Sequence, residues 1–253
     1  MSTTLDKPYT AAALTLAGIG KHFGNLEVLR EVSVQIESGE ILAVLGISGC
    51  GKSTLLNILA GLLPADSGTL RYFGLAANEF RDWRRISYMF QEDRLLPWRN
   101  AVANVALSLE PEPLSKGERI ARARAALRLV DVDKFAKAWP HELSGGMRSR
   151  VALARSLVME PSILLMDEPF STLDSQTRAQ MHRELLRLHA LMSMTVVFVT
   201  HDVEEAVLLA DRVVLLAPRA GQIHAIESID LPRPRAATDL AVSERIRQIR
   251  LQI

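Results

Sequence analysis

The chain has 253 residues and a formal net charge of +1, from 30 basic and 29 acidic residues. This balance gives no electrostatic basis for binding nucleic acid or an anionic membrane surface, and 48% hydrophobic residues is ordinary for a folded α/β protein. The single cysteine, Cys50, excludes an internal disulfide and fits a reducing compartment, and no apolar run approaches the ~20 residues that span a bilayer.

Residues 1–10 are polar and lack the apolar stretch of a secretory signal, so we expect any work at a membrane to go through a partner. The chain then reads as strands separated by turns, and one helical pattern at residues 53–60 follows a wholly apolar run. The strands predicted in this part of the chain cover residues 13–16, 32–36, 41–45, 69–72 and 86–90.

The pattern becomes mostly helical from Pro97 to about Met159. Apolar residues recur at helical spacing between residues 120 and 130, and the arginines between them are interpreted as a solvated face. We therefore interpret residues 92–159 as a helical segment inserted into an α/β core.

The α/β pattern resumes after the insertion. Asp202 and Glu205 have the spacing of a capping box for a helix that runs through residue 209. Beyond them a short terminal helix is predicted after residue 235. The other predicted elements are strands at residues 163–166, 195–200 and 213–216 and a helix at residues 176–191.

Residues 46–54 read GISGCGKST and match the pattern G-x-x-x-x-G-K-[ST] between an apolar strand and a helix. Glycines let backbone N–H groups curve around an anion, and the following helix points its positive end at it. Lys52 can reach the β- and γ-phosphates of a nucleotide, and the Ser53 hydroxyl can ligate Mg²⁺. The predicted phosphate site comprises Gly46, Ser48, Gly49, Cys50, Gly51, Lys52, Ser53 and Thr54.

Two acidic residues, Asp167 and Glu168, end the buried strand at 163–166. A carboxylate at a strand end beside a phosphate loop is placed to hold Mg²⁺, directly or through water, so we assign Asp167 to the metal. Glu168 is then the general base that polarises a water molecule in line with the γ-phosphate. The alternative is a pair of acidic residues that merely caps a strand at the surface.

Three single residues complete the predicted core site. His201 follows a β-branched strand, where ligands of open α/β sheets bind, and can hydrogen-bond the γ-phosphate; the alternative is a helix cap. Gln91 ends the strand at 86–90, and its amide can touch Mg²⁺ or the attacking water. The ring of Phe23 could stack on adenine or simply pack in the core.

Ser144, Gly145 and Gly146 precede a long amphipathic helix at residues 148–158. They offer a second helix start at which an anion can bind, although an ordinary helix cap has the same residues. Because the chain has one phosphate loop, we expect a head-to-tail dimer in which this element covers the nucleotide of the other subunit.

Taken together, these motifs resemble the ATP-binding subunit of ABC transporters over nearly the whole chain. Six motifs of that family occur here in order. They are the Walker A loop at residues 46–53, the Q-loop residue Gln91, the signature at residues 143–146, the Walker B strand at residues 163–167 followed by Glu168, the D-loop at residues 171–174 and the H-loop residue His201.

The resemblance implies a P-loop NTPase (RecA-like) core with an antiparallel β subdomain and an inserted α-helical subdomain. Residues 1–253 then form a single nucleotide-binding domain, with its core at about 10–91 and 160–222, its helical subdomain at about 92–159 and a short extension at 223–253. ATP and Mg²⁺ are the implied ligands. The assigned residues are Glu168, His201, Lys52 and Gln91 for catalysis, Ser53, Gln91 and Asp167 for the metal, and Phe23 with the two glycine-containing loops for the nucleotide.

A finer resemblance is to the nitrate, sulfonate and taurine importers. Residues 90–98 read FQEDRLLPW, and residues 144–148 read SGGMR, as in that subfamily. The subfamily usually has glutamine in place of Ser149 and Gly-Ala in place of Ser171 and Thr172. These departures leave the ATP chemistry intact and bear only on the transported solute.

The resemblance also implies partners. A membrane permease would dock near residues Glu92 to Trp98, where Leu95, Leu96 and Trp98 would suit a groove if they are not buried in the helical lobe. A second nucleotide-binding subunit, identical or related, is expected, with a periplasmic or lipoprotein solute-binding protein acting indirectly and no nucleic acid. The location implied is peripheral, at the cytoplasmic face of the inner membrane. The alternative function is that of a soluble, non-transport ABC-type ATPase.

Overall fold

A computed structural model describes residues 12–218 and 220–253, so the expectation for residues 1–10 lies outside the described residues. Its centre is a six-stranded sheet whose inner strands are buried on both faces. A strand such as β3 can be apolar at every position because helices or another sheet cover both of its faces. In spatial order the strands are β10 (Ile223–Ser228), β9 (Arg212–Leu216), β3 (Ile41–Leu45), β8 (Thr195–Thr200), β7 (Ile163–Asp167) and β6 (Ile86–Met89), parallel except for β10.

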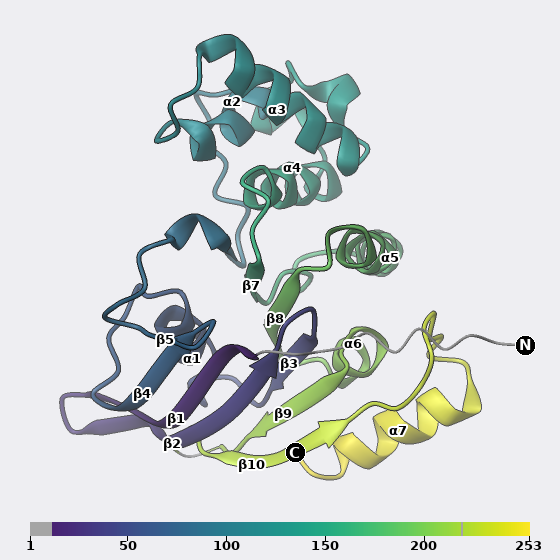
Figure 1. Cartoon of the computed structure of the whole chain (residues 1–253). Coiled ribbons are helices and arrows are strands. Elements are labelled where there is room, and N and C mark those ends of the chain that lie inside the picture. The colour runs from purple at the N-terminus through teal and green to yellow at the C-terminus, as the bar shows by residue number, and fades with distance from the viewer. Residues whose placement is uncertain (1–11, 219) are drawn as a thin grey trace, which may run out of the picture.

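A second, antiparallel sheet lies over one face of the first (Figure 1). Its two long strands turn tightly at Gly24, whose φ of 59° lies in the left-handed region that glycine adopts without strain. The strand order is β2 (Leu26–Glu37), β1 (Ala12–Phe23), β4 (Ser67–Tyr72) and β5 (Leu75–Ala76).

Helices cover both faces of the central sheet. Helix α1 (Lys52–Leu59) buries its leucines with the antiparallel sheet against one face, where Leu42 and Val44 point. Alternate residues of the same strand, Ala43 and Leu45, point to the other face. That face is covered by α5 (Ser175–Met192), α6 (Val203–Leu209) and α7 (Leu240–Arg250).

Three α-helices form a lobe that leaves the core after β6 and returns at β7 (Figure 1). The fully buried Asn104 shapes its entry, because its amide oxygen accepts from Leu96 N at 2.7 Å and its nitrogen donates to Arg99 O at 2.8 Å. Serine and asparagine side chains cap all three helices and so satisfy N–H groups that have no partner within the helix. The helices are α2 (Ala101–Ala106), α3 (Lys116–Leu129) and α4 (Gly145–Leu157).

The architecture confirms the expected fold class, an α/β core with an antiparallel β portion and an inserted helical portion. The structure differs at the C-terminal side, where β10 pairs with β9 across the boundary expected at residue 222. No strand was predicted for residues 223–228, which alternate between half-buried and exposed. The capping box at Asp202 is also wrong in part: Asp202 caps α6, but the Glu205 carboxylate instead accepts from Thr200 Oγ1 at 2.7 Å.

Within the described residues, none of the helices combines the length and the apolar character needed to cross a membrane.

Candidate active site

The loop between β3 and α1 is shaped by glycines that no other residue could replace without strain. Gly51 has a φ of 100°, and a Cβ there would lie 2.8 Å from the Val28 carbonyl oxygen. A Cβ on Gly46 would lie 2.7 Å from the Cys50 sulfur. The loop is therefore closely packed at these glycines, and its backbone is held in the conformation that leads the chain into helix α1.

Lys52, the first residue of α1, lies across this loop. Its side chain is buried, and its Nζ donates to Gly46 O at 2.7 Å and to Ile47 O at 3.0 Å. The same Nζ is 4.0 Å from Glu168 Oε1. A buried cation thus stands between the phosphate loop and the carboxylate assigned as general base.

Ser53 and Asp167 meet beside that lysine. Ser53 Oγ donates to Asp167 Oδ1 at 2.9 Å, and the Tyr88 hydroxyl donates to Asp167 Oδ2 at 3.2 Å. Burial raises the pKa of the Tyr88 hydroxyl well above its usual range, and the Asp167 carboxylate raises it further. A hydroxyl and a carboxylate in contact match the donors that Mg²⁺ takes when substrate phosphates supply the rest, so these residues fit the metal.

Glu168 and His201 come from the ends of neighbouring parallel strands. Glu168 N donates to Val199 O at 3.0 Å, which fixes the residue at the edge of the sheet. Its φ of 42° is unusual for a residue with a side chain, and such strain is found most often where function requires it. Glu168 Oε2 is 3.2 Å from His201 Nδ1, so the two side chains form one hydrogen-bonded pair.

Cys50 contributes to the loop through its backbone only. Its thiol is 2% exposed and lies beneath the loop against Gly46. Burial raises the pKa of the thiol and so disfavours the reactive thiolate. A bulky thiol reagent is therefore not expected to reach this side chain in the folded chain.

Three predicted groups lie apart from this cluster in the described structure. Gln91 Nε2 donates to Ser171 Oγ at 3.4 Å and has no hydrogen bond to a metal-site residue. Ser144 only caps its own helix, with Oγ accepting from Met147 N at 3.3 Å. Phe23 is 50% exposed at the end of β1, which excludes packing of its ring in the core.

The segment after Gln91 is held by the helix that carries the signature. Arg148 Nε donates to Asp93 Oδ2 at 3.0 Å, and Arg155 Nη1 donates to Arg94 O at 2.8 Å. The two arginines are seven positions apart on α4 and therefore share one face of it. A hollow of about 410 Å³ lies here, lined by Gln91, Asp93, Gly145 and Arg148 among others.

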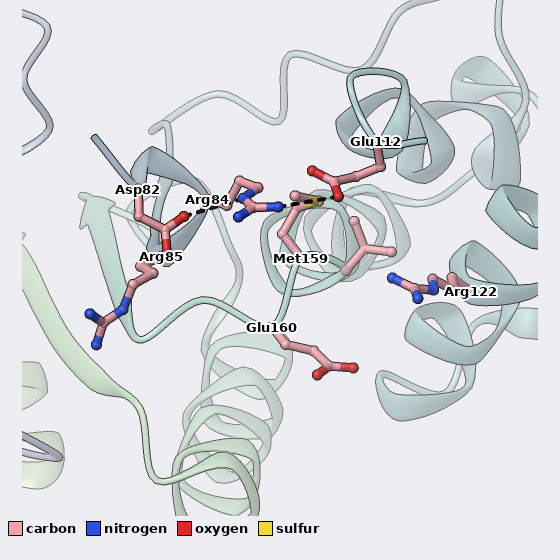
Figure 2. A pocket seen from close by; sticks show the side chains of 8 residues that line it. Asp82, Arg84, Arg85, Glu112, Arg122, Met159 and Glu160 are labelled. Carbon is pink, nitrogen blue, oxygen red and sulfur yellow. Dashed lines mark hydrogen bonds and ion pairs between the residues drawn. The ribbon is translucent and has the colours of Figure 1, made fainter. Parts of the chain in front are cut away.

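A second hollow, of about 280 Å³, lies between the core and the helical lobe and contains none of the predicted site residues (Figure 2). Arg84 bridges it, with Nε 3.2 Å from Asp82 Oδ1 and Nη1 3.5 Å from Glu112 Oε2. Three arginines and three acidic residues line the hollow, so it has no concentrated positive charge. They are Arg84, Arg85 and Arg122 with Asp82, Glu112 and Glu160 (Figure 2).

Sequence reasoning missed the contacts of Tyr88, Arg148 and Arg155. Tyr88 carries no motif, and its contact with Asp167 depends on the pairing of two strands that are far apart in the sequence. The signal that could have found it is position: Tyr88 lies on the strand that Gln91 follows.

Comparisons with known proteins agree with this geometry. The sequence profile of the family described as "ABC transporter" matches residues 29–171. The chain is 46% identical over 230 residues to the aliphatic sulfonates import ATP-binding protein SsuB of Mycobacterium sp. (strain MCS), covering 91% of this chain and 89% of that one. It is 45% identical over 213 residues to the taurine import ATP-binding protein TauB of Rhizobium johnstonii, covering 84% and 80%.

Among solved structures, the ATP-binding cassette MJ0796 in a dimeric, post-hydrolysis state bound to ADP and Pi is similar, with a TM-score of 0.76 and 32% sequence identity. The match covers 87% of this chain and 100% of that chain. The profile match spans more than half of the residues, and the motifs lie in one continuous fold. This chain therefore belongs to the ABC transporter family, of which it is an ATP-binding and ATP-hydrolysing member.

Proposed function

We propose that the chain hydrolyses ATP to drive the import of a small anion, of the sulfonate or taurine type, through a membrane permease. The observation that carries this proposal is the meeting of Lys52, Glu168 and His201 at the carboxyl edge of the parallel sheet, beside the phosphate loop. The names of the similar proteins support the direction of transport and the class of solute. No feature of the chain favours the alternative, a soluble ATPase without a permease.

In the proposed reaction, the loop amides and the α1 N-terminus bind the phosphates, and Lys52 Nζ exchanges its loop carbonyl partners for phosphate oxygens. Glu168 accepts a proton from a water molecule, which attacks the γ-phosphorus as the bond to ADP breaks. His201, paired with Glu168, holds that carboxylate and the γ-phosphate in place. The products are ADP and inorganic phosphate.

Ser53 and Asp167 are proposed to hold Mg²⁺, with Gln91 approaching it once the segment around Gln91 moves inward. The ion would neutralise charge on the β- and γ-phosphates. The donor pair is already assembled, since Ser53 Oγ and Asp167 Oδ1 are 2.9 Å apart.

Two copies, or this chain and a close relative, are proposed to sandwich two nucleotides. Ser144, Gly145 and Gly146 are at the N-terminus of α4, where they contact no phosphate-loop residue within the described structure. They would cover the nucleotide held by the partner's phosphate loop. Phe23 would stack on the adenine of the nucleotide held by the phosphate loop of its own chain. The dimeric state of the similar solved structure supports this arrangement. Closure depends on ATP because the γ-phosphate adds contacts from both sides.

The permease is proposed to dock at residues 92–98 on the cytoplasmic face of the inner membrane, with a periplasmic solute-binding protein delivering the cargo. Trp98 is 69% exposed and offers an apolar contact. Leu95, in contrast, is 8% exposed and packs in the core, so the expectation that it joins the docking groove is wrong.

The test is reconstitution in proteoliposomes with the permease and the binding protein encoded beside this chain. We expect taurine or a short alkanesulfonate, bound to its binding protein, to stimulate ATP hydrolysis and to accumulate inside. Stimulation by a chemically unrelated solute would contradict the proposed cargo. Hydrolysis that is indifferent to every permease would contradict the transport role itself.

A further inference from the structure

The carboxylate of Asp167 is held from two sides. One oxygen, Oδ1, accepts from Ser53 Oγ at 2.9 Å, and the other, Oδ2, accepts from the Tyr88 hydroxyl at 3.2 Å. A carboxylate can only accept hydrogen bonds, so Tyr88 is the donor. Among the described residues, these are the two hydrogen bonds to the Asp167 side chain, and Tyr88 is the partner that no motif accounts for.

Strand register explains why this tyrosine reaches the end of a neighbouring strand. Strands β6 and β7 are parallel, and Tyr88 pairs with Leu165. Asp167 lies two residues beyond Leu165, so its side chain and that of Tyr88 point to the same face of the sheet. Helix α1, which carries Ser53, covers that face. The three side chains thus converge from three elements.

The ring of Tyr88 is itself held in place. It packs against Phe90 with ring centroids 4.5 Å apart, and the Arg94 guanidinium lies 3.9 Å from the Phe90 centroid. The ring is partly buried against the core beside α1. A hydroxyl on a restrained ring fixes the direction of its hydrogen bond more closely than a flexible side chain would.

We propose that Tyr88 is a positioning residue for the metal site: its hydroxyl holds Asp167 Oδ2 and so presents Oδ1 beside Ser53. The inference rests on the proposed role of Ser53 and Asp167 in holding Mg²⁺. Tyr88 touches neither nucleotide nor metal in this account. Partners that orient a metal-ligating carboxylate typically contribute about 10- to 100-fold to metal affinity.

The test compares Tyr88→Phe with a matched control, Tyr72→Phe. Tyr72 is a fully buried tyrosine, and its hydroxyl donates to Leu59 O at 3.0 Å, in the helix behind the phosphate loop. Binding of a non-hydrolysable ATP analogue is measured by calorimetry in EDTA and then across a titration of Mn²⁺, with circular dichroism as a check of folding.

For Tyr88→Phe we expect the affinity for the analogue in EDTA to remain within about twofold of wild type. The Mn²⁺ concentration that gives half of the maximal increase in analogue affinity should rise about 10-fold. Tyr72→Phe should match wild type in both. If Tyr88→Phe and wild type depend on Mn²⁺ equally, the proposed role of Tyr88 is overturned, while the proposed metal site still stands. A loss of analogue affinity in EDTA as large as the loss in Mn²⁺ would also overturn the proposed role, since Tyr88 would then act on the phosphate loop and not on the metal site. A wild-type chain indifferent to Mn²⁺ would overturn the metal site and the inference together.

Discussion

The core and the helical lobe present the residues that we propose bind phosphate in different ways. In the core, Lys52 lies 4.0 Å from Glu168, and Glu168 lies 3.2 Å from His201, so the side chains already contact one another within one chain. In the lobe, Ser144 caps its own helix, and Gly146 packs against Thr177 of α5. The core therefore holds a nearly assembled half of the proposed active site, whereas the signature segment is the half that we propose completes the site of another copy.

The largest effect is expected at the core half. Replacing Glu168 with Gln removes the proposed proton acceptor while keeping the size of the side chain, so hydrolysis should fall about 10²- to 10⁴-fold with ATP binding retained. Steady-state phosphate release and nucleotide binding measure the two properties.

Glu160→Gln is the matched control for this change. Glu160 also has a positive φ, of 53°, and lines the hollow of Figure 2 away from the reaction. Its replacement should leave hydrolysis unchanged. A Glu168→Gln protein that still turns over ATP at the wild-type rate would remove Glu168 from its role.

Next in size is Lys52→Ala, which takes the cation out of the loop. Loss of a charge-assisted hydrogen bond costs about 1.5–3 kcal/mol, so ATP affinity should fall roughly 10- to 100-fold. Adenosine, which lacks phosphates, should bind the variant and wild type equally. An equal loss of affinity for both ligands would mean that the loop had collapsed instead.

The lobe half is tested by Ser144→Ala against Ser115→Ala. Both serines cap a helix, so each change should lower the free energy of unfolding by about 1 kcal/mol. Only Ser144→Ala should slow hydrolysis, by about 10-fold, because its hydroxyl is proposed to reach the nucleotide of the partner. Equal rates of hydrolysis by the two variants would contradict the proposed nucleotide contact and leave Ser144 only as a helix cap.

The smallest effect is expected where core and lobe meet. Arg84 bridges Asp82 and Glu112, but its side chain is 64% exposed, so solvent screens both pairs. Arg84→Ala should change the free energy of unfolding by less than about 1 kcal/mol in a denaturant titration. A change of several kcal/mol would show that this bridge, rather than the shared apolar core, joins the lobe to the core.

These comparisons also indicate how far the sequence alone could lead. Strands β3, β7 and β8 were predictable because residues buried on both faces leave a continuous apolar run. The phosphate loop was predictable because its glycines and Lys52 carry a fixed spacing. The ion pair of Asp93 with Arg148 and the hydrogen bond from Tyr88 to Asp167 were not predictable, since both depend on how separate elements lie in space. Strand β10 was missed because none of its residues is fully buried and its polar residues, His224, Glu227 and Ser228, do not alternate with apolar ones.

The central claim is that ATP is enclosed between two protomers, with the Lys52 loop of one facing the Ser144 segment of the other. Its most direct test is the mass of the Glu168→Gln protein in solution, measured by light scattering with and without ATP. The account predicts twice the 28.0 kDa of the chain with ATP and the single mass without it. A Glu168→Gln protein that binds ATP fully and remains a monomer at every concentration would contradict the account.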